Sequence, residues 1–326
     1  MVHLLHAEIT RLRWRRAVVA LLVLALVVPA VVLAGTLWET RPITEADRTQ
    51  ARAEMEATAE QSVRDCIASP RDWGFRVKDL TPEEIATRCE KRAGNVGEVE
   101  DWIYRPALTI RETREGVGLA VVTILALLAA LIGTTFAGHD WATGSMGNQL
   151  LFESRRLRVW AAKFAAVVAA TGVMALLGLG LFWGGIWVAA EMRDLAVGPN
   201  QWWWSVTAAA RGVVLVAGAG GAAYALTMLL RSTVGALGVI IGASIGSSVL
   251  LAVVLGATAS RWMIGTNAFA FVLGRQEYYV DSEECWRTGE GCTQLLTGPQ
   301  AAVYLAALVL VVVVGSMLSF RRRDVP

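Results

Sequence analysis

Six long apolar stretches constrain this chain more than any other feature of its sequence. Each has about 20 residues or more with at most one charge, enough to cross the ~30 Å hydrocarbon core of a membrane as a helix. The whole chain is 55% hydrophobic and only 18% charged, against about 25% charged residues in a typical soluble domain. We therefore expect an all-α, polytopic membrane protein, because helices satisfy their own backbone groups in lipid. The expected spans are residues 17–37, 116–137, 164–190, 206–230, 233–257 and 300–320.

The basic residues predict which side each loop faces. Six spans place both termini on one side, together with residues 138–163 and the short turn at Arg231. That side carries twelve arginines and lysines, whereas the two shorter loops of the opposite side carry four. The positive-inside rule then places both termini in the cytoplasm, with the chain in the plasma membrane. The first span resembles a signal peptide, but its apolar run is too long for one, so we expect an uncleaved anchor.

The segments outside the spans have features of their own. Residues 1–16 mix apolar and basic side chains, which predicts an amphipathic helix on the cytoplasmic membrane surface. Residues 38–115 form a long extracellular loop, for which we expect a small helical domain. Its helices should begin near Thr44 and at Thr81, where Thr-Pro-Glu-Glu matches a capping box with proline at the first helical position. Residues 258–299 form the last extracellular loop, and residues 321–326 a cytoplasmic tail.

The four cysteines all fall in extracellular loops. Cys66 and Cys89 lie in the first of them, and Cys285 and Cys292 in the last. Thiols gathered on the oxidising side favour disulfides over free structural thiols. Of the three possible pairings, the two local ones, Cys66–Cys89 and Cys285–Cys292, are expected.

Two spans carry residues that suggest a role beyond crossing the membrane. Arg211 lies inside the fourth span, about two turns past the tryptophans at 202–204, where an ionisable side chain needs a partner or water. It is either a candidate for the translocation path or an arginine that reaches out to the lipid headgroups. The fifth span has small residues along one face, which let another helix approach closely, within the subunit or across a dimer. These residues are Gly235, Gly238, Gly242 and Gly246.

Motifs for catalysis and metal binding are absent from the sequence. There is no phosphate-binding GxxxxGK[ST] loop and no HExxH, and His3, His6 and His139 are too dispersed for a metal site. The spans also lack the carboxylates that ion-coupled carriers commonly use. We therefore expect no catalytic residue, no bound metal and no cofactor in this chain.

Residues 138–163 have an ordered pattern of their own. The pattern starts with Asp140 and continues through Gly144-Ser145, Leu150-Leu151, Arg155-Arg156-x-Arg158 and Lys163. This order resembles the cytoplasmic loop after the second span in permease subunits of type-2 ATP-binding-cassette (ABC) exporters. That family usually has Glu, Thr and Pro where this chain has Asp140, Ser145 and Ser154. The N-terminal tail and the Phe-Arg-Arg-Arg-Asp-Val ending are similar to the family as well.

The resemblance implies a non-catalytic permease that forms a translocation path and a dimer with a second permease, identical or different. The energy for transport would come from two copies of a cytoplasmic ABC ATPase, which bind ATP and Mg²⁺. Residues 138–163 would hold a coupling helix that docks its apolar face on this ATPase. The residues assigned to coupling are Asp140, Gly144, Ser145, Leu150, Leu151, Arg155 and Arg156.

Two other classes of function remain open. One is an ATP-independent channel or carrier, and the other is a membrane sensor or immunity subunit whose 38–115 loop binds a ligand. A simpler interpretation of residues 138–163 is an interfacial helix held by arginine contacts to lipid phosphates. The substrate cannot be deduced from the sequence.

Overall fold

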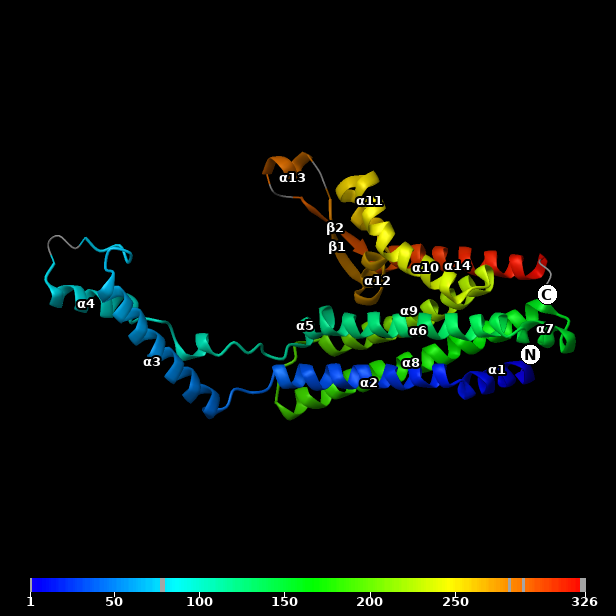
Figure 1. The fold of residues 1–326 in the computed structure, drawn as a ribbon, viewed down its shortest axis with the longest axis horizontal. Coiled ribbons are helices and arrows are strands. Elements are labelled where there is room, and N and C mark those ends of the chain that lie inside the picture. Colours follow the sequence, from blue (N-terminus) through cyan, green and yellow to red (C-terminus); the bar gives the residue numbers. More distant parts are fainter. Residues whose placement is uncertain (1, 77–79, 281–282, 289–290, 323–326) are drawn as a thin grey trace. The chain divides into compact units, whose positions relative to one another are not determined.

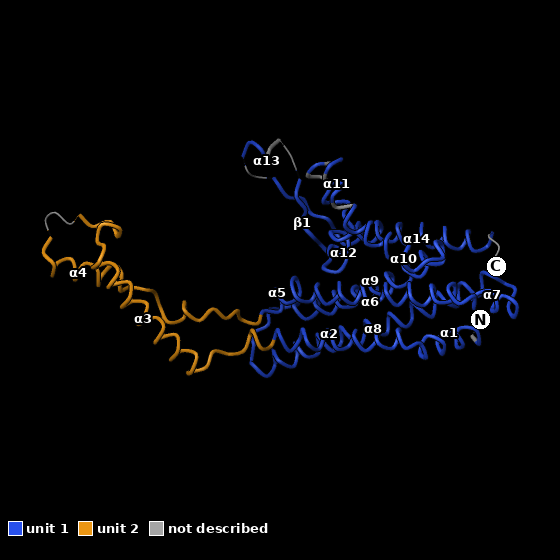
Figure 2. Tube along the Cα trace, in the orientation of Figure 1, with its two compact units in different colours: residues 1–36, 109–326 blue, residues 37–108 orange. Residues whose placement is uncertain are grey.

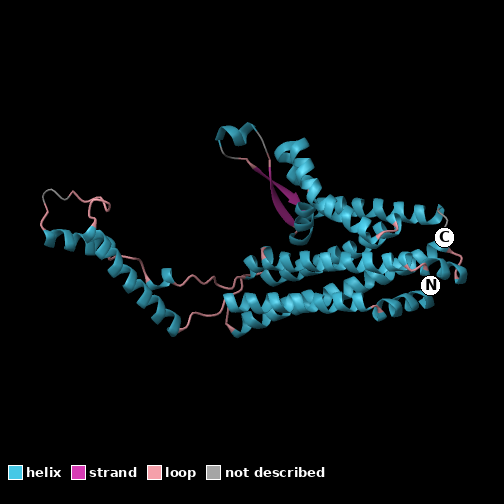
Figure 3. Cartoon of the chain, viewed as in Figure 1, coloured by secondary structure: helices cyan, strands magenta, loops and turns pink. Residues whose placement is uncertain are grey.

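The computed structural model describes residues 2–76, 80–280, 283–288 and 291–322, and these residues are almost entirely helical (Figures 1 and 3). Six helices are long and apolar enough to cross a membrane, which confirms the predicted number and indicates a multi-pass membrane protein. Most of the tail predicted at 321–326 lies outside the described residues. The six helices are α2 (Arg16–Glu39), α5 with α6 (Ile110–Glu115 and Val117–Ala142), α8 (Arg156–Met192), α9 (Gln201–Leu230), α10 with its continuation (Thr233–Leu251) and α14 (Gly298–Arg322).

The chain divides into two compact units (Figure 2). Unit 1 contains residues 1–36 and 109–326, and unit 2 contains residues 37–108. The boundary differs from the predicted loop 38–115, because α5 groups with the membrane helices and leads directly into α6.

The centre of unit 1 is formed by α6, α8 and α9, which pack against one another. Small residues allow this packing: an ideal Cβ at Gly133 of α6 would lie 2.3 Å from the carbonyl oxygen of Gly220 of α9. Tyr224 of α9 is fully buried, and its hydroxyl donates a hydrogen bond to the carbonyl of Trp160 on α8 at 3.2 Å. The Trp160 indole in turn donates to Ser316 of α14 at 3.1 Å, which attaches the last helix to the centre.

Two short helices lie at one end of unit 1, here named the α7 end (Figure 1). They are α1 (Val2–Trp14), which packs against α8, and α7 (Ser145–Phe152), which connects α6 to α8. The ring of Trp141, near the end of α6, contacts that of Phe320 in the last turns of α14. The helices α6 and α14 therefore both finish at the α7 end, and α9 begins at the opposite end.

The fifth predicted span is not one regular helix. After α10 (Thr233–Ile241) the chain makes a π-helical turn at Gly242–Gly246, followed by α11 (Ser247–Leu255) and a 3-10 turn at Gly256–Trp262. Single π-helical turns of this kind are rare and are often found at functional positions in helices.

The all-α prediction was wrong for residues 258–299, which form more than a loop. They contain α12 (Ile264–Leu273), strand β1 (Arg275–Tyr279), α13 (Glu283–Thr288) and strand β2 (Thr293–Thr297). The strands pair antiparallel, with Tyr278 opposite Gln294, and are the only strands in the described part of the chain (Figure 3). The predicted Cys285–Cys292 disulfide closes the connection between them.

Unit 2 is a pair of helices linked by a disulfide, as the sequence predicts. The helices are α3 (Glu45–Ala68) and α4 (Pro82–Ala93), which begin at capping boxes formed by Thr44 and Thr81, and a 3-10 turn follows at Val99–Trp102. Cys66 and Cys89 are bonded and fully buried, with Trp73, Phe75 and Ile85 packed around them. The disulfide thus lies at the centre of a small apolar core.

An ion pair connects the start of α3 to the end of unit 2. The Arg105 guanidinium donates to both carboxylate oxygens of Asp47, at 2.8 and 2.9 Å. These bonds, together with that from the Thr44 backbone amide, hold the pKa of Asp47 well below its ordinary value.

Replacing Gly133 with alanine should destabilise unit 1. The Cβ would meet backbone of α9, so the helices must separate to make room. We expect a loss of about 1–3 kcal/mol, seen as a lower midpoint of thermal unfolding by tryptophan fluorescence in neutral detergent. Gly180→Ala on α8 is the matched control, because no atom lies within 4 Å of its Cβ. Equal midpoints for the two variants would contradict the close packing of α6 and α9.

The Asp47 pair should make unit 2 sensitive to acid. Since the pKa of Asp47 is lowered in the folded state, its contribution to stability is present above the unfolded pKa of about 3.9 and is lost as the pH falls. Asp47→Asn removes the charge at every pH. The stability difference between the parent protein and this variant, measured by circular dichroism during heating, should therefore be largest at pH 7 and shrink below about pH 4. A difference that persists unchanged to pH 2 would argue against the pair.

Candidate functional site

The 138–163 segment turns sharply between α6 and α8. Gly144, the residue just before α7, has a φ of +68°. This left-handed conformation costs residues that have a Cβ atom roughly 1–2 kcal/mol. Ser145 opens the eight-residue helix α7, which ends at Phe152, and α8 starts at Arg156. The Gly-Ser pair of the sequence pattern is thus the point where the chain reverses.

Asp140 lies at the centre of a buried ion network at the base of this turn. Its side chain is 1% exposed and accepts from Lys163 and Arg15, each at 2.5 Å, and from the Ser145 hydroxyl at 2.9 Å. Lys163 itself is fully buried. Of the residues assigned to coupling, Asp140 is buried and Ser145 is half-buried, and their hydrogen bonds fix the start of α7 to α6 and α8.

A second carboxylate, that of Glu8 on α1, completes the network. Glu8 is 3% exposed and accepts from Lys163 at 2.8 Å and from Gln149 of α7 at 3.2 Å. The Arg15 guanidinium also donates to the Phe136 carbonyl at 2.6 Å. The network therefore joins α1, α6, α7 and α8 through side chains that lie far apart in the sequence.

The carboxylates of Asp140 and Glu8 face the cations of Lys163 and Arg15, and the more exposed Arg11 lies 3.5 Å from Glu8. Removing an ion from water costs several kcal/mol even after relaxation, and close opposite charges with good hydrogen bonds offset that cost. Both oxygens of Asp140 and the ammonium of Lys163 are hydrogen-bonded. Such a network is costly to break at any single member, so we expect α7 to keep its position relative to α6 and α8.

The outer surface of α7 is apolar. Leu151 is 83% exposed and Phe152 is 94% exposed, whereas Met146 on the opposite face is buried. Leu150 is half-buried, so Leu151 and Phe152 form the most exposed part of the apolar ridge of α7. Arg155 is exposed beside the ridge and Arg156 is half-buried.

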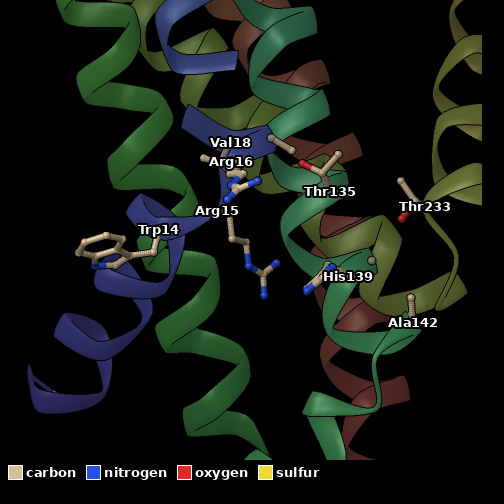
Figure 4. A pocket seen from close by; sticks show the side chains of 10 residues that line it. Trp14, Arg15, Arg16, Val18, Thr135, His139, Ala142 and Thr233 are labelled. Atoms are coloured by element: carbon tan, nitrogen blue, oxygen red, sulfur yellow. The ribbon is translucent and has the colours of Figure 1, made fainter. Parts of the chain in front are cut away.

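A cavity of about 540 Å³ opens next to the network, between the start of α2 and the end of α6 (Figure 4). Arg15 and His139 point toward it, while Trp14 points away. His139 is exposed, and no group of three metal-binding side chains occurs among the described residues. Nothing in this arrangement gives His139 a catalytic partner.

Three of the four glycines of the fifth span have no close neighbour among the described residues. No atom lies within 4 Å of an ideal Cβ at Gly238, Gly242 or Gly246, and Gly235 meets only side chains of Ser232 and Leu230 just before it. The close approaches within unit 1 instead involve Gly133, Gly220 and Gly221. Of the two uses predicted for this face, packing within the subunit is therefore not observed.

Arg211 lies in a different cavity, at the end of unit 1 opposite α7. Its guanidinium approaches Gly274, where α12 ends with a φ of +88° and an added Cβ would lie 2.6 Å from one guanidinium nitrogen. The arginine thus points toward a neighbouring segment of the protein.

Sequence reasoning missed Glu8 and Arg15 as site residues and used Lys163 only as a part of the pattern. Glu8 is the only acidic residue in the otherwise basic N-terminal tail, HLLHAEITRLRWRR. An isolated acid among arginines and apolar residues is a signal for a buried partner, although its position 155 residues before Lys163 hides which partner it has.

Comparison with known proteins found no family model, no curated protein and no solved structure that matches the chain. The resemblance to ABC permeases therefore depends on the sequence pattern of residues 138–163 and its flanking features.

Replacing Lys163 with methionine tests the network. The variant keeps a long apolar side chain but leaves two buried carboxylates without their shared cation, at a cost of about 3–5 kcal/mol. Arg158→Met, an exposed position on the same helix, should change stability by no more than about 0.5 kcal/mol.

Thermal unfolding in neutral detergent provides the measurement for both variants. Adding Asp140→Asn to Lys163→Met should restore part of the loss, because it removes one of the two negative charges that Lys163 compensated. Equal unfolding temperatures for Lys163→Met and Arg158→Met would show that the network does not hold the helices together.

Proposed function

We propose that this chain is the permease subunit of an ATP-driven ABC exporter, and that α7 is the helix through which it couples to a separate ATPase. The observation that carries the proposal is the exposed apolar ridge of Leu151 and Phe152 on a short helix that a buried ion network holds in place. An apolar helix face docked in a groove is a common mode of recognition. The motif order around the ridge supports the same assignment.

The roles of the pattern residues follow from their positions. Asp140, Ser145 and Gly144 would set the direction of α7, and Leu151, Phe152 and Arg155 would touch the ATPase, with Leu150 and Arg156 at the edge of the contact. ATP and Mg²⁺ would bind to the partner, and this chain would carry out no catalysis. The α7 end would then be cytoplasmic, as the excess of arginines there predicts.

Coupling requires a difference in affinity. The ATPase can shift the permease between conformations only if its ATP-bound state binds one of them more tightly. The network ties α7 to α1, α6 and α8, so a displacement of α7 would be passed to three helices together. A path for the exported molecule would need a second permease subunit, and the open glycine face of α10 with its π-helical turn is the surface proposed for it.

The double variant Leu151→Asp, Phe152→Asp tests the docking. We expect the purified ATPase partner to bind at least about 30-fold more weakly, as for the loss of an interface hot spot, and transport to stop. Thermal stability should not change, because both side chains are exposed in the isolated subunit.

Asn148→Asp is the matched control, because it adds a negative charge at another exposed position of α7 without removing apolar surface. Transport at the parental rate by the double variant, or transport without any ATPase, would overturn the proposal and favour an ATP-independent carrier.

A further inference from the structure

A large cavity lies at the end of unit 1 where α9 begins. Its volume is about 1270 Å³. The start of α9, the end of α12 and the two strands line it, together with α5. The cavity is more than large enough for a small ligand, for which pockets of about 300–1,000 Å³ are usual.

The lining is basic. It contains the four arginines Arg111, Arg114, Arg211 and Arg275 against the two glutamates Glu115 and Glu277, a formal excess of two positive charges. An excess of this kind raises the local concentration of anions.

The four arginines differ in how they are neutralised. Arg111 and Arg114 share the carboxylate of Glu115, each at 3.3 Å, and Arg114 also donates to Gln201 and lies over the ring of Trp204. Arg211 and Arg275 form no ion pair within the described part of the chain, although Glu277 is on the same strand as Arg275. Two guanidinium groups are thus left with donors for a ligand.

The charged lining is bordered by large apolar side chains. Trp203 is 64% exposed, Trp204 47% and Leu295 53%, and all three line the cavity with Arg211. Tryptophans at the start of a membrane-crossing helix are typical of the membrane–water interface. The cavity therefore combines anion-binding groups with apolar surface at the depth of lipid headgroups.

We propose that this cavity binds a phosphate group carried by a lipid-like amphiphile, with Arg211 and Arg275 as its ligands. Guanidinium groups match the oxygens of phosphate through paired hydrogen bonds, and the tryptophans and Leu295 cover the first part of the acyl chain. This binding site requires the chain to lie in a membrane but requires no ATPase. The proposal can therefore be correct even if the proposed export function is wrong.

Binding of dioctanoyl phosphatidylglycerol to the purified full-length protein, in neutral detergent and without ATPase, tests the site. Arg211→Gln and Arg275→Gln should each weaken binding by about 10-fold or more, the effect of losing a hydrogen bond to a charged group. Arg275 is exposed on β1, so its variant should fold even if Arg211→Gln does not. Arg287→Gln removes an exposed charge of α13 outside the cavity and should bind as the parent does.

The choice of probe separates the possible sources of the phosphate. Dioctanoylglycerol, a lipid with the same acyl chains but no phosphate, should bind at least about 10-fold more weakly, because it offers no anionic oxygens to the two guanidinium groups. Glycerol phosphate that competes as well as the lipid would keep the anion site and assign it to free phosphates. Equal binding of the two lipids, or parental affinity in both cavity variants, would overturn the proposal, as would an equal loss in Arg287→Gln.

Discussion

The ammonium group of Lys163 lies between the carboxylates of Asp140 and Glu8, and the position of the whole 138–163 segment depends on this arrangement. Without this cation, Asp140 would keep Arg15 and Glu8 would keep only the partly exposed Arg11. Removing one partner of a buried ion pair costs more than most single interactions contribute. With Lys163 in place, hydrogen bonds and ion pairs hold α1, α6, α7 and α8 together at one point, and replacing any single member would leave its partners without their bonds. The short helix α7 is thereby attached to the bundle by charge, while its outer face stays apolar.

Close packing continues this attachment toward the middle of the bundle. The α6 helix that carries Asp140 approaches α9 at Gly133, where backbone meets backbone with no side chain between. Tyr224 of α9 reaches the backbone of α8 one turn before Lys163. Helices packed this tightly move together, because a close-packed interior has low compressibility and transmits strain. A force on α7 would therefore reach α9 through contacts that are already made.

Much of the fold could be predicted because it follows from short-range rules. The six spans are set by length and apolarity, the helices of unit 2 begin at the capping boxes of Thr44 and Thr81, and each disulfide joins cysteines of the same loop. The β-hairpin was missed, because the strands RQEYY and TQLLT are only five residues long and gain their stability from pairing with each other.

The sequence pattern indicated the segment that contains the candidate site, but it did not predict which side chains of that segment contact one another. The pattern correctly brought attention to Asp140 and Lys163, but a pattern along one segment does not say which side chains face inward. Asp140 was assigned to coupling without a prediction of its burial, and it is buried because its partners Arg15 and Lys163 come from other parts of the fold. Long-range pairs of this kind cannot be read from spacing.

Arginines at the two ends of unit 1 illustrate how the same residue type serves different purposes. Arg15 is held by Asp140 and by the Phe136 carbonyl, so its donors are used within the protein and its role is to position helices. Arg211 has no such partner among the described residues and faces a cavity lined by a second unpaired arginine. The distinction comes from the number of donors that the protein itself leaves unused, because only those can bind something else.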